Sequence, residues 1–81
     1  MPEIFRQFGF SFFFYSDDHE PIHVHVEKGE SEAIYEVSED EISLRNNFGM
    51  KNNELRKIEE LINENRNLII DFWTKYFLYK T

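Results

Sequence analysis

All three histidines of this chain, His19, His23 and His25, lie within seven residues of one another. Imidazole is the commonest transition-metal ligand in proteins, and it is also the side chain that gains and loses a proton most readily near neutral pH. Two carboxylates, Asp17 and Asp18, stand directly before the first histidine. This mixture of residue types indicates either a metal site or acid–base chemistry, and we predict the three histidines as the candidate catalytic residues.

His23 and His25 belong to a stretch in which apolar and polar residues alternate, as they do along a β-strand. Side chains two apart on a strand project from the same face, with Cα atoms about 6–7 Å apart, so both imidazoles can reach one ion. A tight turn at Lys28-Gly29 would pair His25 with Glu32 on the following strand. The carboxylate of Glu32 would then stand beside His25.

A side chain from the preceding loop would complete the ligand set, and His19, Asp17 and Asp18 are the candidates. Two or three histidines with one carboxylate bind zinc, or iron or manganese with open coordination positions. Such an ion lowers the pKa of a bound water molecule, so the class of reaction would be hydrolysis. The predicted metal ligands are His19, His23, His25, Glu32 and Asp17.

Two other interpretations of the histidine cluster remain open. The histidines could form only hydrogen bonds and ion pairs with neighbouring carboxylates. Alternatively, without a metal, one histidine would act as a general base and another as a general acid, which gives a bell-shaped dependence of rate on pH. Gly9, Gly29 and Gly49 are isolated in the sequence, so no glycine-rich phosphate loop is present and we predict no residues that bind an organic cofactor.

The chain has 81 residues, which are enough for one small domain over residues 1–81. Its net charge is −7, and residues 17–41 hold ten acidic residues and one basic residue. An acidic half of this kind repels phosphate backbones, which makes it unsuited to binding nucleic acid. The helical half could still contact nucleic acid through its basic residues, or these could form only a solvated helix face; they are Lys51, Arg56, Lys57 and Arg66. The chain lacks cysteine, and its longest apolar runs have four residues, against the ~20 that span a bilayer. We expect a soluble, cytoplasmic protein without a membrane segment.

Period-two patterns fill the first part of the chain, and patterns of period 3.6 fill the second. Phe8, Phe10, Phe12 and Phe14 alternate with Gly9, Ser11 and Phe13, which predicts one central strand there. Further strands are predicted over residues 23–27, 31–37 and 41–44.

Apolar residues recur at helical spacing after residue 50. Asn52 or Asn53 would cap a first helix, and Asn65 or Asn67 a second. The predicted fold class is α+β, an antiparallel β-meander of three to four strands (about residues 4–44) followed by a C-terminal two-helix hairpin (about residues 51–79) packed on one sheet face. The helical apolar positions are Leu55, Ile58, Leu61 and Ile62, then Ile69, Phe72, Trp73, Tyr76 and Phe77.

Four large apolar residues follow one another near the C-terminus, at Tyr76, Phe77, Leu78 and Tyr79. A helix that lies on a sheet buries only one of its faces, so it cannot bury four successive side chains in one small core. We predict that some of the four form an interface with a partner protein or with a second copy of the chain. Packing of the same residues into the core is the alternative.

The segment over residues 14–26 resembles the signature of a bacterial family of domains of unknown function, DUF4160. That signature is an aromatic strand, then D/N-H-x-P-P-H-x-H, then a short acidic hairpin, and it is similar to residues 18–25 and 27–30 here. The resemblance extends from the opening residues to the helix that carries Phe72-Trp73, and so covers nearly the whole chain. Ile22 departs from the pattern, because members usually have a second proline there.

The resemblance implies that the histidines shared by the family correspond to His19, His23 and His25. It also implies a small cognate protein partner, since members are often encoded beside another small protein in an arrangement like a toxin–antitoxin pair. Two functions are therefore considered. The first is a small protein that acts through such a partner. The second is a hydrolase or ribonuclease that uses the histidine cluster, with a divalent metal (zinc, manganese or iron) as its candidate cofactor.

Overall fold

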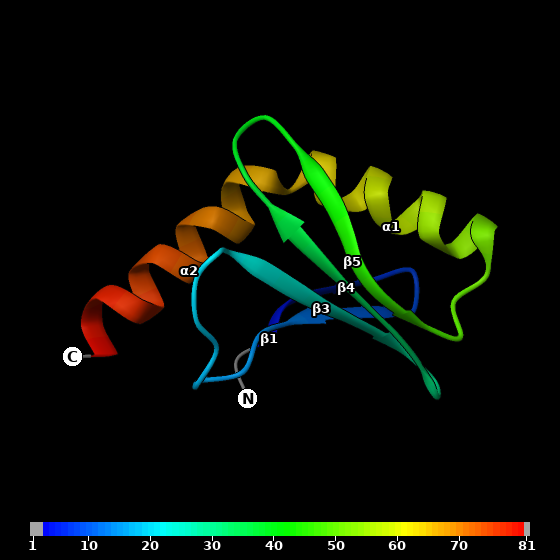
Figure 1. The fold of residues 1–81 in the computed structure, drawn as a ribbon, viewed down its shortest axis with the longest axis horizontal. Helices are drawn as coiled ribbons and strands as arrows, with labels where there is room; N and C mark the ends of the chain where they lie inside the picture. Colours follow the sequence, from blue (N-terminus) through cyan, green and yellow to red (C-terminus); the bar gives the residue numbers. More distant parts are fainter. Residues whose placement is uncertain (1–2, 81) are drawn as a thin grey trace.

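Five antiparallel strands and two C-terminal helices make up the computed structural model, which describes residues 3–80 and their side chains as far as Leu78 (Figure 1). The strands lie in the sheet in chain order, β1-β2-β3-β4-β5, so the sheet is a simple meander. The predicted fold class is thereby confirmed, with five strands in the sheet. The elements are β1 (Glu3–Gln7), β2 (Phe10–Phe13), β3 (His23–Lys28), β4 (Ser31–Val37), β5 (Ile42–Phe48), α1 (Asn52–Glu64) and α2 (Arg66–Lys80).

The N-terminal strand predicted from Phe8 to Phe14 is wrong in its extent, because the chain turns at Phe8-Gly9 and forms a β1–β2 hairpin. Gly9 has a φ of 81° and Phe8 a φ of 54°, in the left-handed region that glycine adopts at little cost. The Phe8 side chain is 62% exposed and lies under the Lys57 ammonium, 4.3 Å from the ring centroid. The alternation of phenylalanines continues across this turn, and so it concealed the turn in the sequence.

The β3–β4 hairpin differs from its prediction by a shift of the turn. The turn lies at Gly29-Glu30, and Glu27 pairs with Glu32 while His25 pairs with Ile34. Moving a two-residue turn by one position moves every pair across the hairpin by two residues, so each side chain keeps its face. Glu32 is therefore a diagonal neighbour of His25 and not its direct partner.

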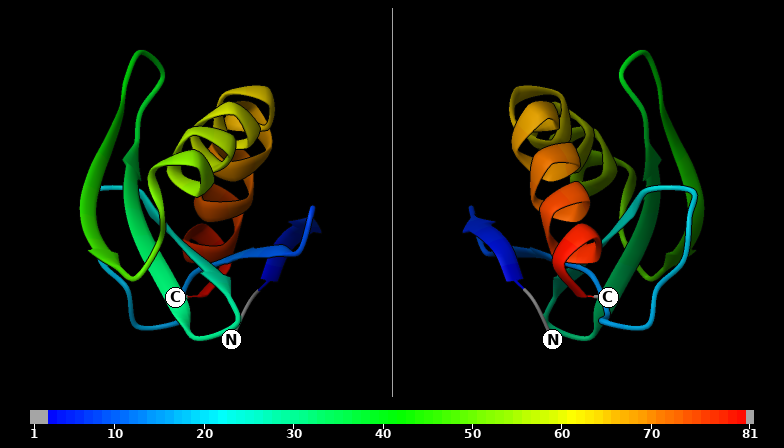
Figure 2. Two further views of the ribbon diagram at one scale, coloured as in Figure 1. Left: turned by 90° about the vertical axis from the view of Figure 1, so that its right-hand side faces the viewer. Right: turned by 90° about the vertical axis from the view of Figure 1, so that its left-hand side faces the viewer.

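The hydrophobic core lies between the helices and one face of the sheet, and the sheet curves around the helices (Figure 2). Alternate residues of the inner strands supply this face, because successive side chains of a strand point to opposite sides. The helices contribute the apolar positions that the 3.6-residue spacing predicts. Fully buried side chains of this core are Phe12, Val24, Val26, Ala33, Tyr35, Ile58, Leu61, Ile62 and Ile69.

The two helices follow one another end to end across the sheet and do not fold back as a hairpin (Figure 1). Helix α1 begins after Lys51, whose backbone N–H donates to Glu54 Oε1 at 2.9 Å, so the cap residue is Lys51 and not Asn52 or Asn53. At the break, the side-chain amide of Asn65 donates to the Leu61 carbonyl at 2.8 Å. One residue of break is too short for a reversal of direction, so α2 continues along the sheet.

The aromatic side of α2 packs on Phe14, the buried residue that follows β2. The ring centroid of Phe14 lies 5.3 Å from that of Trp73 and 5.1 Å from that of Tyr76. Helix α2 extends beyond the end of the sheet at which β3 begins (Figure 1). Neither helix in residues 3–80 combines the length and the apolarity needed to cross a bilayer.

Candidate metal site

Strand β3 places His23 and His25 on the outer face of the sheet, opposite the buried Val24 and Val26. Successive side chains of a strand point to opposite faces, so the two histidines share one face and the two valines share the other. Although they face away from the core, the two histidines are only 5% and 7% exposed.

Aromatic rings and the β2–β3 loop (residues 14–22) cover the two histidines. The ring of Phe13 stacks on His25 at 5.4 Å between centroids, and Tyr15 meets the same imidazole edge to face at 4.7 Å. Trp73 of α2 lies 5.2 Å from the His23 ring. The imidazoles are therefore held in a largely apolar enclosure, in which polar atoms need defined partners.

A tight turn in the β2–β3 loop holds Asp18 over the histidines. The backbone N–H of Asp18 donates to the Tyr15 carbonyl at 3.0 Å, and the Tyr15 N–H donates to Asp18 Oδ2 at 2.8 Å. Aspartate favours such turns because its short side chain reaches nearby backbone groups. The turn thus fixes the direction of this carboxylate as well as the path of the loop.

Three ligand-type atoms converge at this point. Asp18 Oδ2 lies 3.3 Å from His23 Nε2 and 3.3 Å from His25 Nε2. Ligand atoms of Asp18, His23 and His25 all lie within 4.8 Å of one another. Within residues 3–80 this is the one group of three or more histidines and carboxylates that meets that criterion.

The other nitrogen of each imidazole already has an acceptor. His23 Nδ1 lies 2.9 Å from the Pro21 carbonyl oxygen, and His25 Nδ1 lies 3.1 Å from Glu32 Oε2. The Pro21 carbonyl oxygen only accepts, so His23 Nδ1 carries the proton and donates it. Carboxylate oxygens face both nitrogens of His25, Glu32 at Nδ1 and Asp18 at Nε2, and with its proton on Nδ1 this imidazole donates to Glu32. In a neutral imidazole, Nε2 then presents a lone pair.

Two lone pairs and one carboxylate oxygen therefore point at the same space, and acceptors do not satisfy one another. A positive charge at that point resolves the conflict, either as protons on the imidazoles or as a bound metal ion. Metal-bound histidines donate their second ring N–H to a carbonyl or a carboxylate in almost all known sites. His23 and His25 both show this arrangement, so the residues present suit a divalent transition-metal ion.

The predicted ligands divide into two groups in the structure. His23 and His25 belong to the cluster, whereas the side chains of His19 and Asp17 are exposed and lie outside it. Glu32 lies at His25 Nδ1, on the side of the imidazole away from Asp18, and so it is not one of the three converging groups. The carboxylate in the cluster comes from Asp18, one of the three loop candidates in the sequence.

Negative charge surrounds the site. Burial, followed by the negative charges of Glu32, Glu27 and Asp18, raises the pKa of Tyr15 above its ordinary value. Carboxylates grouped on one surface attract cations and repel phosphate groups. The outer face of β3 and β4 therefore favours the approach of a metal ion over that of a polyanion.

The C-terminal residues predicted as an interface differ in their surroundings. Tyr76 and Phe77 are partly buried, and their ring centroids lie 5.1 Å and 5.4 Å from that of Phe14. The side chain of Leu78 is 63% exposed, and that of Tyr79 lies outside the described residues. Exposed apolar side chains on β5, Leu44 and Phe48, were not singled out from the sequence, because the edge position of that strand depends on the topology.

Together, the fold and the site define a small α+β domain with a buried histidine–carboxylate cluster beneath a loop. Residues 9–74 match the profile of the family described as Domain of unknown function (DUF4160), and the chain belongs to this family. Comparisons with curated proteins and with solved structures give no match. The family description names no activity, so chemical arguments about function must come from the site itself.

Proposed function

We propose that this protein binds a divalent transition-metal ion through Asp18 Oδ2, His23 Nε2 and His25 Nε2. The observation that carries the proposal is that Asp18 Oδ2, His23 Nε2 and His25 Nε2 converge while each Nδ1 has an acceptor of its own on the other side of the ring. Two imidazoles and one carboxylate suit zinc, iron or manganese better than calcium or magnesium, which prefer oxygen ligands.

Three protein ligands leave coordination positions for water and substrate, and an ion held in this way supplies activated water for hydrolysis. The residues of the chain would orient the ligands and exclude bulk water, since both histidines are buried. A substrate would reach the ion only after the β2–β3 loop moves. The acidic surroundings favour a neutral or cationic substrate over a phosphodiester, so hydrolysis is better supported than ribonuclease activity.

The experiment is a titration of the untagged protein with Co²⁺ and Zn²⁺, followed by visible absorption and calorimetry. We expect one ion per chain, with loss of binding in His25→Ala and in Asp18→Asn. The chain offers matched controls, because His19→Ala and Asp17→Asn remove the same groups from exposed positions a few residues away. Binding that survives His25→Ala, or that is lost in His19→Ala, would contradict the proposed ligand set.

Binding of a protein partner is the second candidate function, as one component of a toxin–antitoxin-like pair. It is favoured by large apolar side chains exposed away from the core, of which Phe48 is 57% exposed and Leu68 44% exposed. Such side chains often lie at interfaces when they gather on one surface. Co-expression with the product of a neighbouring small gene, followed by size-exclusion chromatography, tests the candidate, and separate elution of the two proteins would contradict it.

A further inference from the structure

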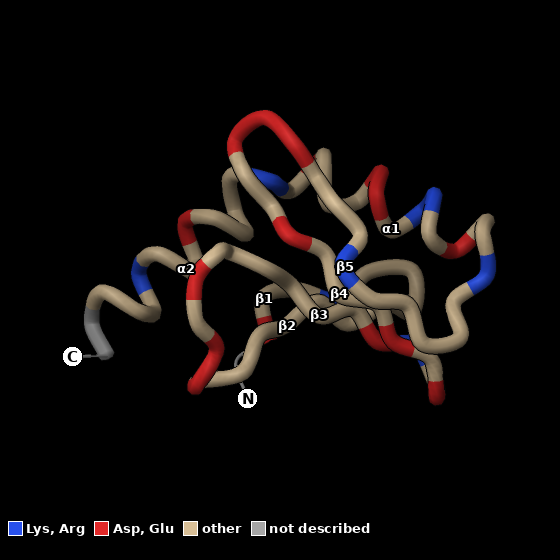
Figure 3. Tube along the Cα trace, in the orientation of Figure 1, with Lys and Arg blue, Asp and Glu red and all other residues tan. Residues whose placement is uncertain are grey.

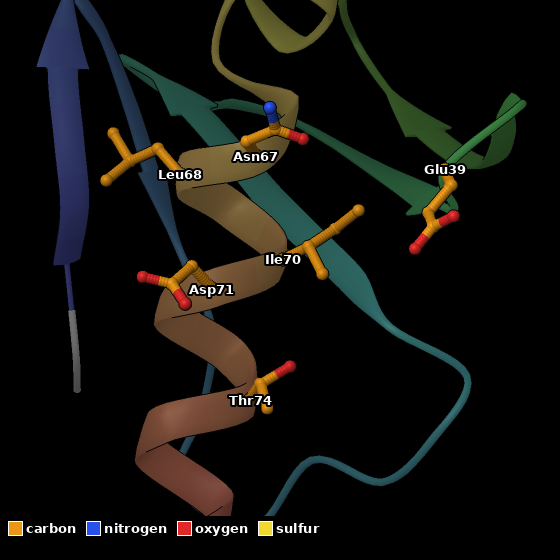
Figure 4. Close-up of a pocket in the computed structure, with 6 residues that line it drawn as sticks. All are labelled: Glu39, Asn67, Leu68, Ile70, Asp71 and Thr74. Carbon is orange, nitrogen blue, oxygen red and sulfur yellow. The ribbon is translucent and has the colours of Figure 1, made fainter.

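A hollow of about 570 Å³ lies between α2 and the loop that joins β4 to β5 (Figure 4). Ile70 and Thr74 of α2 point toward the loop, and Glu39 faces them from the other side (Figure 4). Ile70 is partly buried against the core, so the hollow has an apolar element within reach of solvent. The lining residues are Glu39, Asn67, Leu68, Ile70, Asp71 and Thr74.

The β4–β5 loop carries three carboxylates in succession, Glu39, Asp40 and Glu41, and projects beyond the sheet (Figure 3). All three residues are exposed, and none of their carboxylates forms an ion pair with any residue in the described part of the chain. Asp71 differs, because its carboxylate pairs with Lys75 Nζ at 3.0 Å. In the described part of the chain, the carboxylate at the hollow that forms no ion pair therefore comes from the loop.

Hydrogen bonds hold the acidic loop in place. The Ser38 N–H donates to the Glu41 carbonyl at 2.9 Å, and the Glu41 N–H donates to Ser38 Oγ at 3.0 Å. The Arg66 guanidinium donates to the carbonyls of Ser38 and Glu41, which ties the loop to the start of α2. Loop and helix thus present their groups in a defined geometry, which lowers the ordering cost of binding.

A second hollow, of about 310 Å³, lies against the same loop. Glu36 and Glu41 both line it, together with Ile22. The carboxylate of Glu36 lies 3.5 Å from Arg45 Nε, so Glu41 supplies the free charge there. A peptide segment that crosses the loop would therefore pass from one acidic, partly apolar hollow to another.

We infer that this loop and its two hollows bind a short basic segment of a partner protein. Lysine or arginine side chains of that segment would contact Glu39, Asp40 and Glu41, and an apolar side chain would lie against Ile70. The charges decide between occupants, since nucleic acid would be repelled, and a second copy of a chain with net charge −7 would bring like charges together. This inference rests on the partner-binding function and does not depend on the metal site.

The test uses an eight-residue peptide of alternating lysine and leucine as the probe, added to ¹⁵N-labelled protein. We expect chemical-shift changes in the β4–β5 loop and in residues 67–74 of α2. E39Q/D40N/E41Q should weaken the peptide affinity about tenfold, because three exposed charge contacts are lost. E27Q/E30Q/E60Q removes the same total charge from exposed sites that line neither hollow, and should change the affinity by less than about threefold.

A second pair of variants adds charge instead of removing it. Thr74→Lys places a positive charge at the hollow on an exposed helical position, and should weaken binding about threefold or more. Asn53→Lys adds the same charge at the start of α1, and should have little effect. Each variant is first compared with the unmodified protein by its thermal unfolding curve.

Three results would overturn the inference. Equal weakening by both triple variants would show attraction by net charge alone. Shift changes centred on residues outside the loop and α2 would place the binding surface elsewhere. Concentration-dependent dimers that Thr74→Lys dissociates would show that a second copy occupies the hollow. The metal titration and this peptide titration use different variants, so failure of one leaves the other result intact.

Discussion

The two faces of strand β3 are both buried, but by different means. Val24 and Val26 face the helices and are fully buried among apolar side chains. His23 and His25 alternate with them and lie under a loop and a few aromatic rings. On the first face, removing apolar area from water stabilises the folded state by about 25 cal/mol per Å² buried.

Burial on the histidine face depends on hydrogen-bond partners. Among the described residues, every buried side-chain nitrogen or oxygen has a hydrogen-bond partner within reach, and for His25 Nε2 that partner is Asp18 Oδ2, provided that Nε2 carries a proton. A buried polar group with its partners contributes little net stability, whereas the same group without them is costly. The comparison separates a face whose apolar burial favours folding from a face that holds the proposed ligand atoms.

The largest effect is expected on the helix face. Phe12→Ala should lower the free energy of unfolding by about 3–5 kcal/mol, because Phe12 is fully buried and stacks on Phe5 at 4.3 Å between centroids. Urea denaturation measures this change. Phe8→Ala is the control, since an exposed ring should cost less than about 1 kcal/mol. Equal costs for the two substitutions would show that the core is not where the structure places it.

Metal binding at the histidine face of β3 should produce the next largest change in stability. Zinc at 100 times its Kd should raise the free energy of unfolding by about 2.7 kcal/mol, because only the folded chain brings the three ligands together. Thermal unfolding with zinc and then with a chelator measures the difference. The increase should disappear in His23→Ala and persist in Phe8→Ala. An unchanged melting temperature in saturating zinc, cobalt and manganese would contradict metal binding.

A smaller effect is expected from the group behind His25. Glu32→Gln removes the negative charge that accepts from His25 Nδ1, and should weaken zinc binding about 10–100-fold while leaving one ion per chain. Isothermal titration gives both the affinity and the stoichiometry. Glu30→Gln, in the adjacent exposed turn, should leave both unchanged. Loss of stoichiometry in Glu32→Gln would instead make Glu32 a direct ligand.

The smallest effect concerns a polar group on the helix face. Burial, then the hydrogen bond to Glu59, raises the pKa of Tyr35 above its ordinary value. A raised folded-state pKa contributes stability that is complete below the unfolded value of about 10 and is lost as the pH rises toward the folded value. Tyr35→Phe should cost about 1 kcal/mol at neutral pH and reduce this alkaline loss. Denaturation at several pH values checks this, and identical alkaline profiles for both proteins would contradict it.

Several features followed from the sequence alone. The pattern of period two predicted β4 with the bounds that it has, and it placed His23 and His25 on one face. The apolar face of α2 was also predicted by the helical spacing, and Ile69 and Trp73 on that face are buried. Local periodicity carries this information, because the side a residue faces depends mainly on its element and on its place in that element.

Other features were decided only by the tertiary structure. The choice of Asp18 over Asp17 or His19 depends on a turn whose hydrogen bonds join Tyr15 to Asp18. The hydrogen bond between His25 and Glu32 depends on the register of the β3–β4 hairpin. Moving the turn by one residue changes that register by two residues. Periodicity assigns a side chain to a face but does not say which loop residue will meet it. That meeting is set by turns and packing between distant segments, and so it is a property of the folded chain.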